Sequence, residues 1–203
     1  MKTAEPQATA DAWLAQAVAH QRAGRWPEAE AAYNEALRRQ PDLLPARLGL
    51  AAALAALGRP AEAADAWRDA LAIAPDHVEA RLRLGEAQLA AGDAAGAERS
   101  WRELLAGSPE YVPANLALAR VLARSGDSAG ALACFRRVLA RRPEHCEAHR
   151  ACADVHLGRG EYSEAILHYR LALETERDQP EMLERLRAAE RRLADGGGKP
   201  DRN

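Results

Sequence analysis

The stretch GDAAGAERSWRELLAGSP, residues 92–109, returns 34 residues later as GDSAGALACFRRVLARRP, residues 126–143. Both copies open with glycine, carry an alanine and then an aromatic residue in the middle, and close with proline. The same four columns run along the chain at a constant step of 34 residues: Gly24, Gly58, Gly92, Gly126 and Gly160; Ala29, Ala63, Ala97, Ala131 and Ala165; Tyr33, Trp67, Trp101, Phe135 and Tyr169; Pro41, Pro75, Pro109 and Pro143. Self-similarity at this fixed period predicts stacked helical hairpins.

Each column has a mechanical role in such a hairpin. Glycine ends the first helix in a left-handed conformation, and proline follows the second helix because it cannot continue one. Alanine lets the two helices approach closely, and the aromatic residue one turn later fills the space beside it. Acidic residues are expected to open the helices, after the glycine (Asp93, Asp127 and Glu161) and after the proline (Asp42, Asp76, Glu110 and Glu144).

The pattern Gly-x4-Ala-x3-aromatic, followed by proline at the repeat end, resembles the tetratricopeptide repeat. This resemblance implies an all-α fold: a right-handed α-solenoid of five antiparallel helix-hairpin repeats of 34 residues each, plus a C-terminal capping helix. The boundaries we predict are a flexible N-terminus 1–9, repeats 10–43, 44–77, 78–111, 112–145 and 146–179, a capping helix 180–194 and a flexible tail 195–203. Trp13 fits the family's early aromatic position, whereas Arg47, Arg81, Asn115 and His149 replace it, which predicts leaner packing between helices.

The amino-acid composition argues against several classes of function. Hydrophobic residues make up 48% of the chain and aromatic residues only 4%, so alanine, the best helix former, supplies much of the apolar content. A net charge of -2 argues against nucleic-acid and anionic-membrane partners, which need a concentrated positive face. Three cysteines without CxxC spacing, an N-terminus without an apolar core and no long apolar run predict a cytoplasmic protein, which we take to be bacterial, with no membrane insertion.

Two motifs raise catalytic or metal-binding alternatives. Gly126-Asp127-Ser128-Ala129-Gly130 matches G-x-S-x-G, but that motif needs a strand before its serine and a helix is expected here. His149, Cys152 and His156 could share one helical face toward a soft metal, although the same positions are expected to face the partner helix. We therefore predict no catalytic residue, no cofactor and no metal site, and keep a metal-binding or hydrolytic protein as a remote alternative.

The resemblance implies that first helices line a concave groove in which partners bind. One groove column reads Leu14, Leu48, Leu82 and Leu116 and then changes to Arg150. The partner-binding residues that we predict are Leu48, Leu82, Glu86, Leu89, Leu116, Arg120, Arg124, Arg150 and Asp154. The alternative is that the leucines are buried at the seam between repeats. Leu14 and Val18, or Leu48 and Ala52, stand where a carboxylate clamp would place lysine and asparagine, which disfavours chaperone-tail binding.

The favoured interpretation is a scaffold or adaptor that binds a protein or peptide partner, not an enzyme. Such a groove suits an amphipathic helix or an extended segment. We expect Leu82→Arg combined with Leu116→Arg to abolish partner capture without changing thermal melting. An accessory subunit of a transferase or of a secretion or assembly complex is the alternative, and self-association through the array ends stays open.

Overall fold

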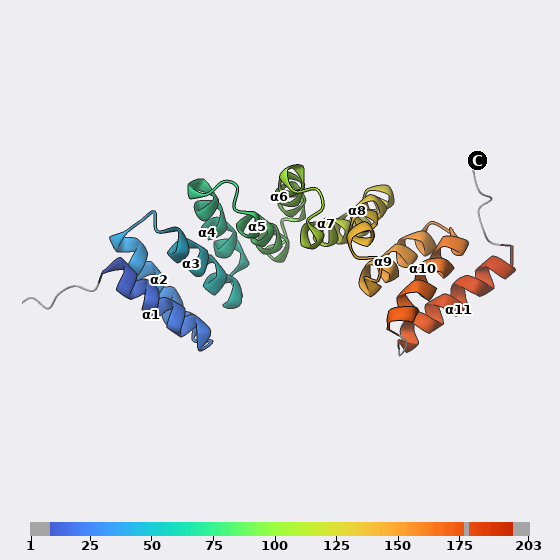
Figure 1. Ribbon diagram of the computed structural model, residues 1–203, viewed down its shortest axis with the longest axis horizontal. Coiled ribbons are helices and arrows are strands. Elements are labelled where there is room, and N and C mark those ends of the chain that lie inside the picture. Colours follow the sequence, from blue (N-terminus) through green and yellow to red (C-terminus); the bar gives the residue numbers. More distant parts are fainter. Residues whose placement is uncertain (1–8, 177–178, 197–203) are drawn as a thin grey trace, which may run out of the picture. The chain divides into compact units, whose positions relative to one another are not determined.

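A computed structural model describes residues 9–176 and 179–196, and in these ranges the chain is helical, with no strand. This confirms the all-α expectation. The helices are α1 Ala10–Arg22, α2 Trp26–Arg39, α3 Leu44–Ala56, α4 Pro60–Ile73, α5 Val78–Ala90, α6 Ala94–Gly107, α7 Val112–Ser125, α8 Ser128–Arg141, α9 Cys146–Gly158, α10 Tyr162–Thr175 and α11 Pro180–Ala194. Within α1–α5 and within α7–α10, short turns join the helices, so that successive helices run antiparallel (Figure 1).

The helices fall into two compact units that divide within α6, unit 1 ending at Leu104 and unit 2 beginning at Leu105. In unit 1, α1 packs on α2, α2 on α3, α3 on α4 and α4 on α5, and α1 also contacts α3. In unit 2, the same serial packing links α7, α8, α9, α10 and α11. Within each unit, every helix therefore rests on its neighbours in the sequence, as stacked hairpins require.

The turn inside each hairpin follows the glycine prediction. Gly126 ends α7 with φ at 89°, and the equivalent glycines also have positive φ. The Asp127 carboxylate then accepts a hydrogen bond from the Gly130 amide at 2.9 Å and so caps the N-terminus of α8. Asp93 does the same for α6 through the Gly96 amide at 2.8 Å. The start signals expected at Asp93 and Asp127 are thereby confirmed, whereas Glu161 occupies the N-cap position of α10 without a side-chain cap hydrogen bond.

The turn between hairpins differs from the prediction. The four acidic residues after the proline do not open the first helices that follow, which begin two residues later: Asp42 before α3, Asp76 before α5, Glu110 before α7 and Glu144 before α9. The chain makes a further turn after the proline, closed before α5 by the His77 amide, which donates to the Ala74 carbonyl at 3.1 Å. Histidine takes the capping place. The His77 Nδ1 accepts from the Ala80 amide at 3.1 Å, and the His145 Nδ1 accepts from the Ala148 amide at 3.2 Å.

In the core of each hairpin, small side chains pack against large aromatic ones. The alanine column is fully buried, and the aromatic residues beside it are almost so, with Tyr33 and Trp101 each 1% exposed. Gly85 on α5 makes room for Trp101, since a Cβ at this position would overlap the indole ring. Close approach of the helices thus depends on the absence of a side chain opposite the aromatic ring.

Gly126→Ala is expected to lower the free energy of unfolding by about 1 kcal/mol, since a Cβ is strained at positive φ. Chemical denaturation followed by far-UV circular dichroism measures the change. Gly158→Ala is the matched control in the same unit, because Gly158 ends α9 without a positive φ and has nothing within 4 Å of an added Cβ. Equal losses in the two variants would contradict the strain argument.

The chain ends that we expect to be flexible lie largely outside the described residues, since residues 1–8 and 197–203 are not described. The division into five repeats stays a prediction. Among the helices of the described ranges, none is both long and apolar enough to cross a lipid bilayer.

Candidate functional site

The first helices of unit 2 lie side by side and present one common surface. Arg120 of α7 forms an ion pair with Glu147 of α9. Arg185 of α11 in turn places its Nη1 2.7 Å from the Oδ1 of Asp154 of α9. These contacts join α7, α9 and α11. We call their shared surface the unit 2 face, made of Leu116, Arg120, Arg124, Glu147, Arg150, Asp154 and Arg185.

All five predicted partner-binding residues of unit 2 carry some exposure on this surface. Arg120, Arg124 and Arg150 are exposed, and Leu116 and Asp154 are half-buried. The arrangement is one half-buried leucine, Leu116, followed by guanidinium groups on two neighbouring first helices. It can bind carboxylates by charge-assisted hydrogen bonds and apolar side chains by burial.

Asp154 already has two partners inside unit 2. Its Oδ1 accepts hydrogen bonds from the Tyr169 hydroxyl at 2.6 Å and from the Arg185 Nη1 at 2.7 Å. Burial raises the pKa of Tyr169 above its usual range, and the hydrogen bond to the Asp154 carboxylate raises it further. Asp154 therefore fastens α9, α10 and α11 to one another, and only part of its carboxylate remains for a partner.

The predicted residues of unit 1 are less uniform. Glu86 is exposed and lies 2.8 Å from Arg83, while Leu48 and Leu89 are half-buried. Leu82 is only 4% exposed. An arginine at this position would bury an unpaired charge, which is strongly destabilising. The expectation that Leu82→Arg leaves melting unchanged is therefore wrong, and at Leu82 the alternative of a buried leucine applies.

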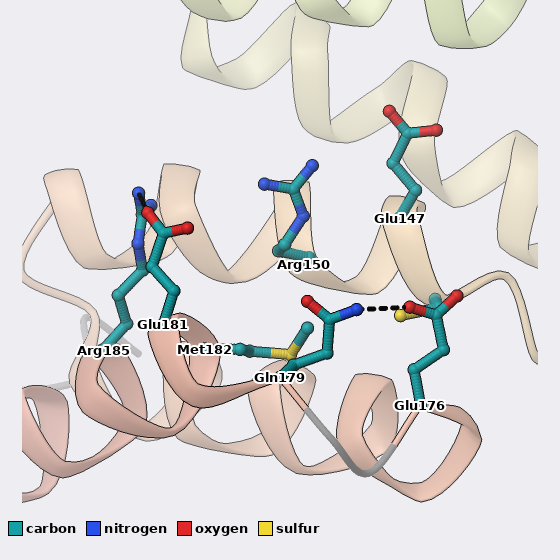
Figure 2. Close-up of a pocket in the computed structure, with 8 residues that line it drawn as sticks. Glu147, Arg150, Glu176, Gln179, Glu181, Met182 and Arg185 are labelled. Carbon is teal, nitrogen blue, oxygen red and sulfur yellow. Dashed lines mark hydrogen bonds and ion pairs between the residues drawn. The ribbon is translucent and has the colours of Figure 1, made fainter.

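A pocket of about 200 Å³ opens on unit 2 between the first turns of α9 and α11 (Figure 2). Its walls are charged and its floor contains sulfur: it is lined by Cys146, Glu147, Arg150, Glu176, Gln179, Glu181, Met182 and Arg185. Only Arg150 belongs to the predicted set. The change from leucine to arginine in the groove column pointed to Arg150. Glu176 and Gln179 lie outside the helices whose register the period defines, so the sequence could not place them here.

The three residues proposed as an alternative metal site are engaged within unit 2. His149 is 7% exposed and Cys152 1%, and burial raises the pKa of the Cys152 thiol to about 12. The His149 Nδ1 lies 2.9 Å from the His168 Nδ1, and the His156 Nδ1 lies 2.7 Å from the Glu161 Oε2. Throughout the described part of the chain, no group of three histidine, cysteine or acidic side chains has an arrangement that could hold a metal ion.

The serine of the G-x-S-x-G match lies at the start of α8, immediately after the turn that follows α7. A nucleophile elbow needs a strand before its serine. Helix α7 stands in that place, and the Asp127 carboxylate caps the Gly130 amide instead of activating a nucleophile. The glycines and aspartate of the match thus serve the hairpin turn.

Two family models, both described as tetratricopeptide repeat, match most of the chain. One covers residues 4–43, 14–76 and 116–180, and the other covers residues 54–100 and 88–139. The chain belongs to the tetratricopeptide-repeat family. Among curated proteins, none matches the chain in sequence.

Solved structures of tetratricopeptide-repeat proteins have the same fold. MamA from Desulfovibrio magneticus RS-1 is 20% identical, with a TM-score of 0.77 over 84% of this chain and 96% of that one. YrrB, described as a TPR protein with an unusual peptide-binding site, is 18% identical, with a TM-score of 0.76 over 86% of this chain and 90% of that one. PilF of Pseudomonas aeruginosa is 19% identical, with a TM-score of 0.73 over 92% of this chain and 85% of that one. The expected α-solenoid fold is confirmed.

One column of this tetratricopeptide-repeat chain departs from the family pattern to form hydrogen bonds. The side chains that replace the early aromatic residue all reach back to the carbonyl of the repeat-end proline: Arg47 to Pro41 (2.8 Å), Arg81 to Pro75, Asn115 to Pro109 (2.9 Å) and His149 to Pro143 (2.8 Å). These four side chains thus close the turn between hairpins. The sequence predicted only leaner packing at these positions and did not predict this role.

Proposed function

We propose that this chain is a non-catalytic scaffold that binds a segment of a partner protein on its first-helix faces. The observation that carries the proposal is the unit 2 face, where Arg120, Arg124 and Arg150 stand exposed on neighbouring first helices beside half-buried Leu116. Membership of the tetratricopeptide-repeat family supports a role in protein interaction. The peptide-binding site named for YrrB supports the same interpretation.

The unit 2 face would bind with little rearrangement. Its helices are packed into unit 2, and the Asp154 carboxylate joins α9, α10 and α11 through Tyr169 and Arg185, so a partner need not order them. A partner segment would bury Leu116 and place polar or acidic groups against the arginines. Preorganisation of this kind lowers the entropic cost of association, and the arginines would accelerate encounter with an acidic segment.

The remaining expectations stay predictions. An accessory subunit of a transferase or of a secretion or assembly complex would use the same faces. A cytoplasmic location, bacterial origin, self-association and the lack of nucleic-acid binding depend on the sequence alone. A hydrolytic or metal-binding role is disfavoured by the helix before Ser128 and by the buried Cys152 thiol.

Arg120→Glu combined with Arg124→Glu is expected to lower partner capture at least about 10-fold, because the change replaces attraction by like-charge repulsion at the centre of the unit 2 face. The measurement is affinity capture from the native cell with quantitative mass spectrometry, using the full chain as bait. Both side chains are exposed, and an exposed ion pair such as Arg120–Glu147 contributes little to stability, so thermal melting should change little.

The matched control is Arg136→Glu combined with Arg137→Glu on α8, the second helix of the same hairpin, which makes the same change in charge at exposed positions. Partners that are lost only with the α7 pair are the ones that bind the first-helix face. Equal loss with both pairs, or no loss with the α7 pair, would place binding elsewhere.

A further inference from the structure

We propose that unit 2 pairs with a second copy of this chain through the exposed side of α10, with the two α10 helices antiparallel and a two-fold axis at Leu167. This association goes beyond the proposed function, because α10 is a second helix and lies outside the unit 2 face. Leu167 is 57% exposed, more than any other large hydrophobic residue in the described part of the chain. The other exposed residues of this kind lie at or next to helix ends: Ile73, Val78 and Leu193.

The 34-residue period shows that packing within the hairpin does not require this leucine. The equivalent residues of the other second helices are alanine, aspartate or arginine: Ala31, Asp65, Arg99 and Ala133. In α4, Asp65 forms an ion pair with Arg68, the residue equivalent to Arg170. In α10 a leucine stands in the place of that carboxylate, so apolar surface is exposed beside the arginine.

Leu167 is the centre of a patch on one side of α10. Residues three and four positions apart lie on the same side of a helix, so Glu164, Arg170 and Leu171 share the side of Leu167. Arg170 is exposed, and Glu164 and Leu171 are half-buried. The patch therefore has apolar surface at its centre, a carboxylate about one turn before it and a guanidinium about one turn after it.

A two-fold axis through Leu167 makes this patch complementary to itself. In such a dimer every contact between two different residues occurs twice. Glu164 and Arg170 lie at equal distances along the helix from Leu167 and on opposite flanks of it. The two-fold rotation reverses both the direction and the flank, so Glu164 of each copy faces the partner's Arg170. The two Leu167 side chains then meet at the axis.

Both charged groups are able to form these contacts. Within residues 9–176 and 179–196, the Glu164 carboxylate has neither a hydrogen bond nor an ion pair. Arg170 places its Nη2 2.8 Å from the Oε1 of Glu190 on α11 and so uses only part of the five N–H donors of its guanidinium. A carboxylate of the second copy can therefore bind Arg170 without displacing Glu190.

Burial of the leucines drives this association, and the two ion pairs set its direction. A single pair of helices buries less surface than the roughly 1,200 Å² of a stable interface. We therefore expect weak association, with a Kd between about 10 µM and 1 mM.

The first test is sedimentation equilibrium of the full chain at concentrations up to about 1 mM. We expect the average mass to rise from the 22.0 kDa of one copy toward twice that value. Leu167→Asp should weaken association at least about 10-fold, because it removes the apolar centre and sets two carboxylates face to face. The control is Ala133→Asp, the equivalent change at an exposed position of α8, which should leave association unchanged.

The second test exchanges charges between copies. Glu164→Arg alone and Arg170→Glu alone should each weaken self-association at least about 10-fold, because like charges then meet on both sides of the axis. An equimolar mixture of the two variants should associate as the unaltered chain does, since every arginine again faces a carboxylate. Thermal melting followed by far-UV circular dichroism verifies that each variant is folded.

A chain that stays monomeric up to about 1 mM would overturn the proposal, even if another protein proved to bind α10. Association that Leu167→Asp leaves unchanged, or that Ala133→Asp weakens equally, would place the contact on another surface. A mixture that associates no better than the single variants would exclude the antiparallel arrangement about Leu167. None of these results bears on the unit 2 face, so the proposed scaffold function is tested separately.

Discussion

Trp101→Ala is expected to lower the free energy of unfolding of unit 1 by about 3–5 kcal/mol. The indole is 1% exposed, and its Nε1 donates to the Leu82 carbonyl at 3.2 Å. The substitution therefore removes buried apolar surface, leaves a cavity and deprives a helix carbonyl of its donor. Denaturation can be followed by tryptophan fluorescence, because the three remaining tryptophans, Trp13, Trp26 and Trp67, all lie in unit 1.

Gly85→Ala tests whether the Trp101 indole is the reason that position 85 requires glycine. In the unaltered chain its Cβ would overlap the Trp101 ring, and such overpacking costs about 1–3 kcal/mol. In the Trp101→Ala background the overlap is gone, so the higher helix propensity of alanine should make the same change stabilising by up to about 1 kcal/mol. A reversal of sign between the two backgrounds is the expected coupling. The same sign in both would show that Gly85 is not shaped by the indole.

Most of the fold could be predicted from the 34-residue period, because the residues that recur specify local backbone geometry. Gly126 needs a left-handed backbone, and Asp127 can cap only the helix that follows it, so both roles can be predicted from neighbours in the sequence. The pairing of small and aromatic columns is equally local, since the two helices of a hairpin are joined by a short turn. These expectations are the ones that the structure confirms.

Side-chain roles that depend on the path of a turn could not be predicted in this way. Arg47 and Asn115 share a register, but the period does not show that the chain returns a proline carbonyl to within hydrogen-bonding distance of both. Likewise, Leu48, Leu82 and Leu116 are equivalent in sequence, yet only Leu82 is buried, because the cover that neighbouring side chains provide differs from copy to copy.

Part of the candidate site could be predicted from the sequence, and the part that depends on packing could not. Arg150 was marked by the change in its column. The sequence predicts that His149 faces the partner helix, but helical spacing groups it only with Cys152 and His156 and does not identify its hydrogen-bond partner, His168 on α10. Spacing within a helix shows which side chains share a face, and only packing shows what that face meets.

Acidification from pH 6.5 to pH 4 is expected to destabilise unit 2 by up to about 3 kcal/mol through His168. Burial, and then the neighbouring His149 and His156, lower the pKa of His168 from 6.5 to about 4. The unfolded chain therefore binds the proton first. The contribution is complete above pH 6.5, declines as the pH falls and is lost below about pH 4. Urea denaturation at a series of pH values, followed by far-UV circular dichroism, measures this slope.

The rings of His149 and His156 add to the effect of burial in lowering the pKa of His168. The His149 Nε2 lies 2.8 Å from the Pro143 carbonyl and donates to it. The His149 Nδ1 and the His168 Nδ1 lie 2.9 Å apart and share one proton, so a further proton on either ring would set two N–H groups against each other. The ring of His156 stacks on that of His168 at 5.6 Å, and the His156 Nδ1 lies beside Glu161. A second positive charge among these rings would meet the first at close range, which is the like-charge effect that lowers a histidine pKa.

His168→Gln isolates this effect, because a glutamine amide can either donate to the His149 Nδ1 or accept from it but does not titrate in this range. The carboxylates that protonate near pH 4 are common to both chains, so the difference between the two pH profiles belongs to the histidine cluster. We expect the variant to lose most of the slope between pH 6.5 and pH 4. Parallel profiles would show that protonation of His168 is not what destabilises unit 2, and that the cluster accepts a proton without opening the hairpin of α9 and α10.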